Sequence, residues 1–189
     1  YNLELYPKAL EDYNKAIVLD STNADFYCGR TGVYESLGQY NGALKDYNMA
    51  IELDQENPAY YYYRAQLYAE YFKLYDKALM DYSLVAKLNP TYLSIYNDIG
   101  AIYAKGFKDY NMALEYYNKE IEINPNNAIS YFNKGSLYLN HLNQYDKALE
   151  ALNKGISLDP ENANYYYNRG LLYFKTEKYD KALIDYLAV

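Results

Sequence analysis

The residues that most often carry catalysis are scarce in this sequence of 189 residues. It contains one histidine, His141, and one cysteine, Cys28. Nucleophilic catalysis pairs a nucleophile with a base, and metal centres built on His or Cys need several ligands, so neither site can be assembled here. We expect His141 to lie on the surface in a turn and Cys28 to act as a small apolar side chain on a helix.

Two other kinds of catalytic chemistry also lack a pattern in the chain. Neighbouring carboxylates such as Glu11 and Asp12 occur, but they fall on the surface of a predicted helix. A Gly-rich phosphate-binding loop is absent from the sequence. The sequence therefore predicts no catalytic residue, no metal site and no cofactor. A role as the regulatory domain of an enzyme would require sequence outside this segment.

Composition narrows the range of partners. The formal net charge is −7 and the isoelectric point is about 4.8, the opposite of the basic surface that selects nucleic acid or an anionic membrane. Apolar runs stay short of the roughly 18 residues that a membrane helix needs. We expect no nucleic-acid partner and no membrane partner. The single cysteine fits a reducing compartment without requiring one, so the compartment stays open.

A motif of the form Tyr-x-x-Ala-Leu recurs six times along the chain. It reads YPKAL, YNGAL, YDKAL, YNMAL, YDKAL and YDKAL, and its alanines are Ala9, Ala43, Ala78, Ala113, Ala148 and Ala182. Successive alanines are separated by 34, 35, 35, 35 and 34 residues. A period in this range is typical of a solenoid in which helical units stack on their neighbours.

Each repeat holds two predicted amphipathic helices. In the first helix an opening tyrosine, a small residue and a closing tyrosine recur at i, i+4 and i+7, as in Tyr96, Gly100 and Tyr103. In the second helix the repeat motif places apolar residues at i, i+3, i+4, i+7 and i+11, counted from Tyr75. The turns between repeats contain prolines, which end a helix: Pro90, Pro125 and Pro160.

This pattern resembles the tetratricopeptide repeat, a helix-turn-helix unit of about 34 residues. The resemblance covers essentially the whole chain and implies an all-α, right-handed superhelix of tandem units. It divides the chain into a second helix at 1–23, full units at 24–57, 58–92, 93–127 and 128–162, and a truncated unit at 163–189. Three positions depart from the family pattern: the opening residue is Tyr where Trp is usual, Thr31 occupies a small-residue position, and Glu120 stands where sister repeats have Ala.

The repeat accounts for most of the 30 tyrosines, because 21 of them fall at fixed positions in its helices. A tyrosine ring can pack in an array too thin to bury anything completely, while its hydroxyl meets water or a carbonyl. We therefore expect the tyrosine-rich composition to serve mainly the core.

Charged residues vary together between repeats. Where the residue three after the opening tyrosine is Arg, the residue three after the motif alanine is Asp: Arg30 with Asp46, Arg64 with Asp81, and Arg169 with Asp185. We predict an ion pair that joins the two helices of each of these units. Lys134 lacks the aspartate, and we expect it to pair with Glu120 of the preceding unit. The alternative is independent variation on solvated faces, where an ion pair contributes only about 0–1 kcal/mol.

The resemblance also implies that the first helices line a concave groove that binds peptides or partner helices. Its positions are one and five residues after each opening tyrosine, and almost none of them is charged. Family members that hold the terminal aspartate of heat-shock chaperones use Lys and Asn there; this chain has no such Lys, so that function is not carried over. The predicted ligand groove is neutral and rich in aromatic and amide groups: Tyr62, Gln66, Asn97, Phe132, Ser136, Tyr167 and Leu171.

Two classes of function remain open at this point. One is a scaffold that presents the groove to a protein or peptide; aromatic faces could also stack on a glycan, without further support. The other is a structural element that extends itself end to end with copies of itself. Because the sequence starts at Tyr1 without a Met or leader and stops at Val189 before a capping helix, we expect a longer parent and uncovered terminal faces. A groove that binds nothing is the alternative to the scaffold.

One spacing differs between repeats. The closing tyrosine and the next motif tyrosine are six residues apart in Tyr34 to Tyr40, but seven apart in Tyr68 to Tyr75 and in the two repeats that follow. Because a loop absorbs an insertion more easily than a packed helix, we expect these three turns to bulge outward.

Overall fold

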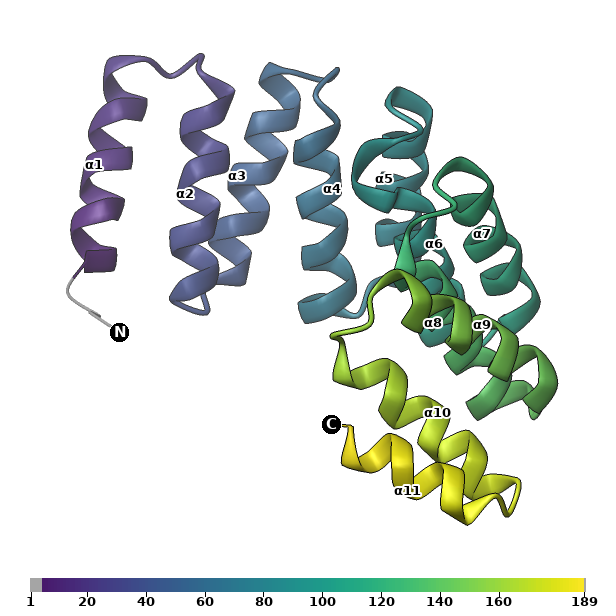
Figure 1. The fold of residues 1–189 in the computed structure, drawn as a ribbon. Coiled ribbons are helices and arrows are strands. Elements are labelled where there is room, and N and C mark those ends of the chain that lie inside the picture. The colour runs from purple at the N-terminus through teal and green to yellow at the C-terminus, as the bar shows by residue number, and fades with distance from the viewer. Residues whose placement is uncertain (1–4, 189) are drawn as a thin grey trace. The chain divides into compact units, whose positions relative to one another are not determined.

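The structure, a computed structural model, describes residues 5–188, and the described chain consists of helices joined by short turns, without a strand (Figure 1). This confirms the predicted all-α class. No helix within residues 5–188 is both long and apolar enough to cross a membrane. The α-helices are α1 (Leu5–Leu19), α2 (Ala24–Ser36), α3 (Tyr40–Leu53), α4 (Pro58–Leu67), α5 (Tyr75–Leu88), α6 (Ile95–Ile102), α7 (Tyr110–Ile123), α8 (Ala128–Leu137), α9 (Tyr145–Leu158), α10 (Ala163–Lys175) and α11 (Tyr179–Leu187).

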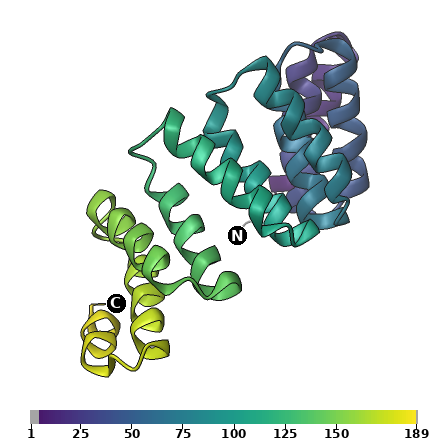
Figure 2. The same cartoon turned by 90° about the vertical axis from the view of Figure 1, so that its right-hand side faces the viewer.

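The chain forms two compact segments, one up to Tyr92 and one from Leu93 onward. In the first, helices α1 to α5 pack each on the next, and α1 to α4 lie side by side in Figure 1. In the second, helices α6 to α11 pack consecutively in the same way (Figure 2). Residues 1–4 and 189 of the predicted array lie outside the described residues. The division into repeats remains a proposal from the sequence.

Asparagine side chains begin four of the first helices. The Oδ1 atoms of Asn23, Asn57, Asn127 and Asn162 each accept a hydrogen bond from the backbone N–H two residues further on. Such an N-cap satisfies one of the backbone donors that have no partner inside the helix. Helix α6 begins differently, after a short 3₁₀ turn, η2 (Tyr92–Ser94), whose last residue adopts a left-handed conformation at φ 58°.

Small residues let the two helices of a unit approach closely. The motif alanines Ala43, Ala78, Ala113 and Ala148 are all completely buried. A Cβ atom added at Gly100 would lie 2.6 Å from the ring of Tyr117, and one at Gly170 would lie 2.7 Å from the ring of Tyr186. Each aromatic ring of the second helix therefore occupies space that a larger residue in the first helix would need.

The tyrosines at the opening position combine packing with a hydrogen bond. Four of the five donate the hydroxyl to a backbone carbonyl six residues earlier, in the turn before the helix: Tyr27 to Ser21, Tyr61 to Gln55, Tyr131 to Pro125 and Tyr166 to Pro160, at 3.0–3.2 Å. In the second helices, Tyr47, Tyr82 and Tyr117 are each 4% exposed. The tyrosines thus serve the core in the manner expected of an amphipathic ring.

The expectation that three turns bulge outward is wrong. The extra residue instead widens the last turn of the first helix into a π-helical turn: η1 (Tyr68–Phe72), η3 (Tyr103–Phe107) and η4 (Tyr138–Leu142). In η1 the carbonyl of Tyr68 accepts bonds from the N–H groups of Lys73 and Leu74. A wider turn keeps these backbone groups bonded, whereas a looped-out residue would leave them unpaired.

A residue in the left-handed conformation follows the end of the first helix in each of the five units. It is Gly38 in one unit and Glu177 in another, and it is Lys73, Lys108 and Asn143 after the π-helical turns, with φ values of 52–68°. Only glycine adopts this conformation without a steric cost, so the lysine positions are locally strained.

We expect the substitution Lys108→Gly to raise the free energy of unfolding by about 0.5–1 kcal/mol. It removes a steric cost of about 1–2 kcal/mol at φ 59°, offset in part by the greater freedom of glycine in the unfolded chain. Urea unfolding followed by circular dichroism measures the change. As a control, Glu115→Gly within α7 should lower the same free energy by about 1 kcal/mol. A loss of similar size at both positions would show that the left-handed lysine is not strained.

Candidate functional site

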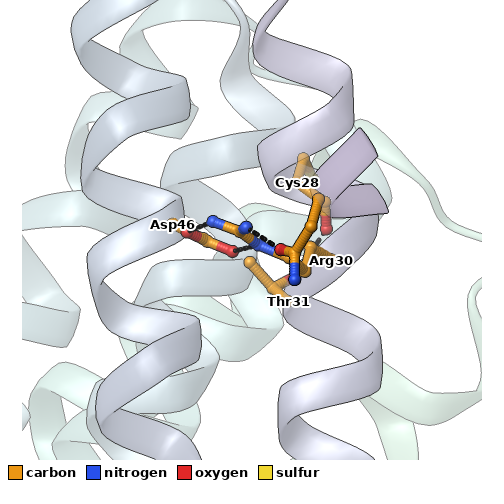
Figure 3. Close-up of polar contacts among 5 residues, drawn as sticks. Cys28, Arg30, Thr31 and Asp46 are labelled. Atoms are coloured by element: carbon orange, nitrogen blue, oxygen red, sulfur yellow. Dashed lines mark hydrogen bonds and ion pairs between the residues drawn. The ribbon is translucent and has the colours of Figure 1, made fainter. Parts of the chain in front are cut away.

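Three arginine–aspartate pairs connect the helices within their units. The Nε and Nη2 atoms of Arg30 donate to the two carboxylate oxygens of Asp46 (Figure 3), and both hydrogen bonds are 2.7 Å long. The pair of Arg64 with Asp81 and the pair of Arg169 with Asp185 repeat this geometry at 2.7–2.8 Å. The aspartate side chains are only 4–9% exposed, so these are partly buried, bidentate pairs rather than solvated ones.

A third side chain completes each pair. The remaining terminal nitrogen of the guanidinium, Nη1, donates to an asparagine sixteen residues earlier, on the preceding helix: Asn14 for Arg30, Asn48 for Arg64 and Asn153 for Arg169. We call this arrangement the Asn–Arg–Asp layer. The sequence reasoning missed the asparagine, although its constant distance from the arginine was a readable signal.

The tyrosines of the first helix flank the guanidinium of the layer. The centre of the Arg30 guanidinium lies 5.8 Å from the ring of Tyr27 and 5.5 Å from the ring of Tyr34. Arg64 lies at 5.7 and 5.8 Å from the corresponding rings. The hydrogen bonds to Asp46 raise the pKa of Arg30 above its usual value, so the cation is held in its charged form.

The two remaining repeats lack the layer. In α6 and α7 its place is taken by Ile99, which is 1% exposed, and by Tyr116, whose ring stacks on that of Tyr103 at 5.4 Å. The structure does not bring Lys134 and Glu120 together. Glu120 is buried in α7 and accepts a hydrogen bond at 3.3 Å from the side-chain amide of Asn127, the N-cap residue of α8, which lies seven residues further on.

Two residues of the predicted groove belong to the interior. Tyr62 is 8% exposed and packs against the rings of Tyr63, Tyr82 and Tyr92 within the first segment. Asn97 is 6% exposed, and its side-chain amide donates to the hydroxyl of Ser130 at 2.8 Å. Neither side chain offers much surface to a ligand.

The other predicted groove residues are accessible to different degrees. Gln66 donates to the Tyr62 hydroxyl at 3.2 Å, and Phe132 packs edge-on against Tyr165 at 5.1 Å. Ser136 and Leu171 are half-buried, whereas Tyr167 is 55% exposed. The accessible part of the predicted groove in the second segment therefore centres on Tyr167.

The candidates for catalysis do not form a site. His141 is exposed and stacks on Tyr110 at 4.5 Å; it lies in the last turn of the first helix rather than between helices. Burial raises the pKa of Cys28 to about 11, with smaller contributions from Asp25 and Glu35, so its thiol stays protonated at neutral pH. Within residues 5–188, no cluster of three or more metal-binding side chains exists.

Sequence comparison identifies a repeat family along most of the chain. The family model described as "TPR repeat" matches residues 1–38, 32–70 and 139–177. Two models described as "Tetratricopeptide repeat" match residues 116–150 and 93–127. Among curated proteins, no sequence matches.

Solved structures with the same fold are numerous. PilF of Pseudomonas aeruginosa aligns with a TM-score of 0.79 at 19% identity, covering 96% of this chain and 82% of that one. MamA of Desulfovibrio magneticus RS-1 aligns at 0.72 and 23% identity, covering 87% and 91%. YrrB, described as "a TPR protein with an unusual peptide-binding site", aligns at 0.68 and 25% identity, covering 93% and 89%. These matches confirm the predicted fold class, an all-α solenoid of tandem helix pairs.

We expect a double-mutant cycle on Arg64 and Asp81 to show a coupling free energy of about 1–3 kcal/mol, because two charge-assisted hydrogen bonds join groups with little exposure. The variants Arg64→Met, Asp81→Asn and their combination are compared by urea unfolding. The exposed pair Lys15–Glu11 provides a control that should give less than about 0.5 kcal/mol. Equal coupling in both pairs would mean that the layer adds nothing to an ordinary surface contact.

Proposed function

The chain belongs to the tetratricopeptide repeat family, and from that premise we propose that it is a non-enzymatic scaffold for protein–protein interaction. It presents a neutral groove, rich in aromatic and amide groups, to a peptide or a partner helix. The observation that carries this proposal is the exposed ring of Tyr167 beside the half-buried Leu171, at the groove positions of α10. Apolar surface with a few polar groups is the usual composition of a ligand site.

Polar groups at other predicted groove positions support recognition of a peptide rather than of a purely apolar ligand. The hydroxyl of Ser136 on α8 has no hydrogen-bond partner among residues 5–188, and a buried hydroxyl is normally satisfied by a ligand or a water. In the first segment, the groove residue Gln66 is half-buried. The similar protein YrrB is itself described as having a peptide-binding site.

The chemistry of the groove limits the partner. None of the predicted groove residues is charged, so a free carboxylate or a phosphate gains no ionic contact there. The net charge of −7 disfavours nucleic acid and anionic membranes. Stacking on a glycan has no support beyond the presence of aromatic rings. A peptide or helix with apolar and amide-bearing side chains is the partner that fits.

Self-association is a second candidate function, and exposed apolar side chains favour it. On α1, Val18 and Leu19 are 85% and 87% exposed. On α11, Leu183, Ile184 and Leu187 are 59%, 67% and 78% exposed. Contiguous apolar surface of this kind marks contact with another molecule. Contact between α1 of one copy and α11 of another would be head-to-tail and would extend the array.

We expect Tyr167→Ala to weaken a groove peptide by about tenfold, because removing an exposed aromatic anchor costs about 1–2 kcal/mol of binding free energy. The peptide is selected from a random display library against the unmodified chain, and its affinity is measured by calorimetry. Tyr179→Ala removes a ring of similar exposure, 57%, outside the groove and should leave the affinity unchanged. Equal losses in the two variants, with intact circular dichroism, would count against the groove.

If the chain extends itself, its light-scattering mass should rise with concentration. The variant Ile184→Lys should then weaken association by about tenfold or more, since it replaces an apolar side chain worth about 1.5–3 kcal/mol when buried. Met80→Lys, at a site 72% exposed on α5, should have no effect. A mass that stays at one chain over the whole concentration range would exclude this second function.

A further inference from the structure

The slot between the two helices of a unit is filled in different ways along the chain. We define the slot by the opening and closing tyrosines of the first helix and by the residue three after the motif alanine. In three units it holds the arginine–aspartate pair, with Asp46, Asp81 or Asp185 contributed by the second helix. Between α6 and α7 it holds the ring of Tyr116, which stacks on Tyr103.

The slot between α8 and α9 has neither filling. Both tyrosines are present, as Tyr131 and Tyr138, but Lys134 replaces the arginine and Ala151 replaces the aspartate. These four residues line a cavity of about 480 Å³, together with Lys147 and Lys154 of α9. The missing aspartate has therefore left open space beside a cation and two aromatic rings.

The cavity is positively charged within an acidic chain. Its lining contains three lysines and one carboxylate, Glu150, whereas the whole chain carries a net charge of −7. None of the three lysines forms an ion pair within the described residues. The ammonium of Lys147 lies 5.5 Å from the centre of the Tyr138 ring, so it is held at the slot. Three cations beside a single carboxylate leave a local excess of positive charge, which attracts an anion from outside.

We propose that this cavity binds a carboxylate. The ligand carboxylate would occupy the place that Asp46 occupies in its own unit, with Lys134 as the cation and the rings of Tyr131 and Tyr138 at its sides. A carboxylate fits better than a phosphate, because sister slots already accept a carboxylate and because Glu150 repels a doubly charged group. Lysine supplies a flexible point charge rather than the planar fork of arginine, so the ligand is held without a fixed bidentate geometry.

The carboxylate cavity is separate from the predicted groove. Tyr131, Lys134 and Tyr138 are spaced at i, i+3 and i+7, which places them on one face of the helix, whereas the groove residues Phe132 and Ser136 are one and five residues after Tyr131. The proposal therefore does not depend on the groove binding a peptide. The carboxylate has two sources, a free dicarboxylic acid or an acidic side chain of a partner, and different probes distinguish them.

The test uses the full chain labelled with ¹⁵N and three probes: succinate, a short Glu/Asp peptide with blocked ends, and inorganic phosphate. Succinate or the peptide should shift the amide resonances of Lys134 and Ala151 in a saturable way, and phosphate should not. Ala151→Asp restores the internal carboxylate and should weaken binding at least tenfold, as should Lys134→Met, because each removes a charge-assisted contact. Lys77→Met is the control. Lys77 of α5 corresponds to Lys147 of α9 and lies over the ring of Tyr68, but it is outside the cavity.

The outcomes separate cleanly. Stronger binding of succinate assigns a free acid, and stronger binding of the peptide assigns an acidic side chain; both support the site. Absence of saturable shifts, or unchanged binding by Ala151→Asp, overturns the proposal. Preference for phosphate over both carboxylates overturns the assigned ligand class. Should Lys134→Met fail to fold, Ala151→Asp still decides, because sister units accommodate an aspartate at this position and the variant should be at least as stable as the parent chain.

Discussion

The close crossing of the two helices in each unit is the contact on which the other features depend. In two units a glycine of the first helix faces a bulky side chain of the second: Gly100 meets Tyr117, Gly135 meets Leu152, and an added Cβ atom would come within 2.6–2.9 Å of either partner. With the helices this close, the motif alanines Ala43, Ala78, Ala113 and Ala148 are fully buried, and aromatic rings fill the space between neighbouring helices. A thin layered core of this kind suits tyrosine, whose hydroxyl reaches a carbonyl at the edge of the layer.

The Asn–Arg–Asp layer is built on top of this crossing and does not create it. Each layer joins three consecutive helices, because the arginine binds the aspartate of its own unit and the asparagine of the helix before. Removing one partner from such a layer leaves a charge with little solvation, which explains why arginine and aspartate are lost together rather than singly. Tyr116 and Ile99 show that an apolar filling serves equally well, since the crossing itself is held by Gly100 and Tyr117.

The sequence predicted the helices and three of the four proposed ion pairs, because these follow from spacing along one unit. The period of the motif alanines, the proline turns and the joint variation of Arg64 with Asp81 all report contacts between helices of fixed register. The exposure of individual side chains was harder to predict, because it depends on contacts with neighbouring units. Tyr62 and Asn97 occupy groove positions, yet rings of Tyr82 and Tyr92 cover the first and Ser130 binds the second. Glu120 was predicted to pair with Lys134, but it accepts a hydrogen bond from Asn127 instead.

The π-helical turns show a different limit of sequence-based prediction. The spacing of seven residues between the closing tyrosine and the next motif tyrosine was visible in the sequence, but both a loop and a widened helical turn can accommodate the extra residue. The backbone decides between them, because the carbonyls of Tyr68, Tyr103 and Tyr138 bond to N–H groups five and six residues ahead and no added group has to be looped into solvent.

In a repeat protein, a binding site can arise when one unit lacks a side chain that fills the same slot in its sister units. In an ordinary core, replacing aspartate by alanine leaves a buried cation and destabilises the protein, whereas here the crossing of Gly135 with Leu152 holds α8 and α9 without help from the slot. Lysine instead of arginine at position 134 further reduces the destabilisation caused by an unpaired cation. The lysine side chain is flexible and can carry its ammonium toward water when the slot is empty. Stability and binding are thus carried by different residues of the same unit. A slot that is ionic in three units and aromatic in another can stay open in the fifth, where Lys134, Tyr131 and Tyr138 line the same cavity.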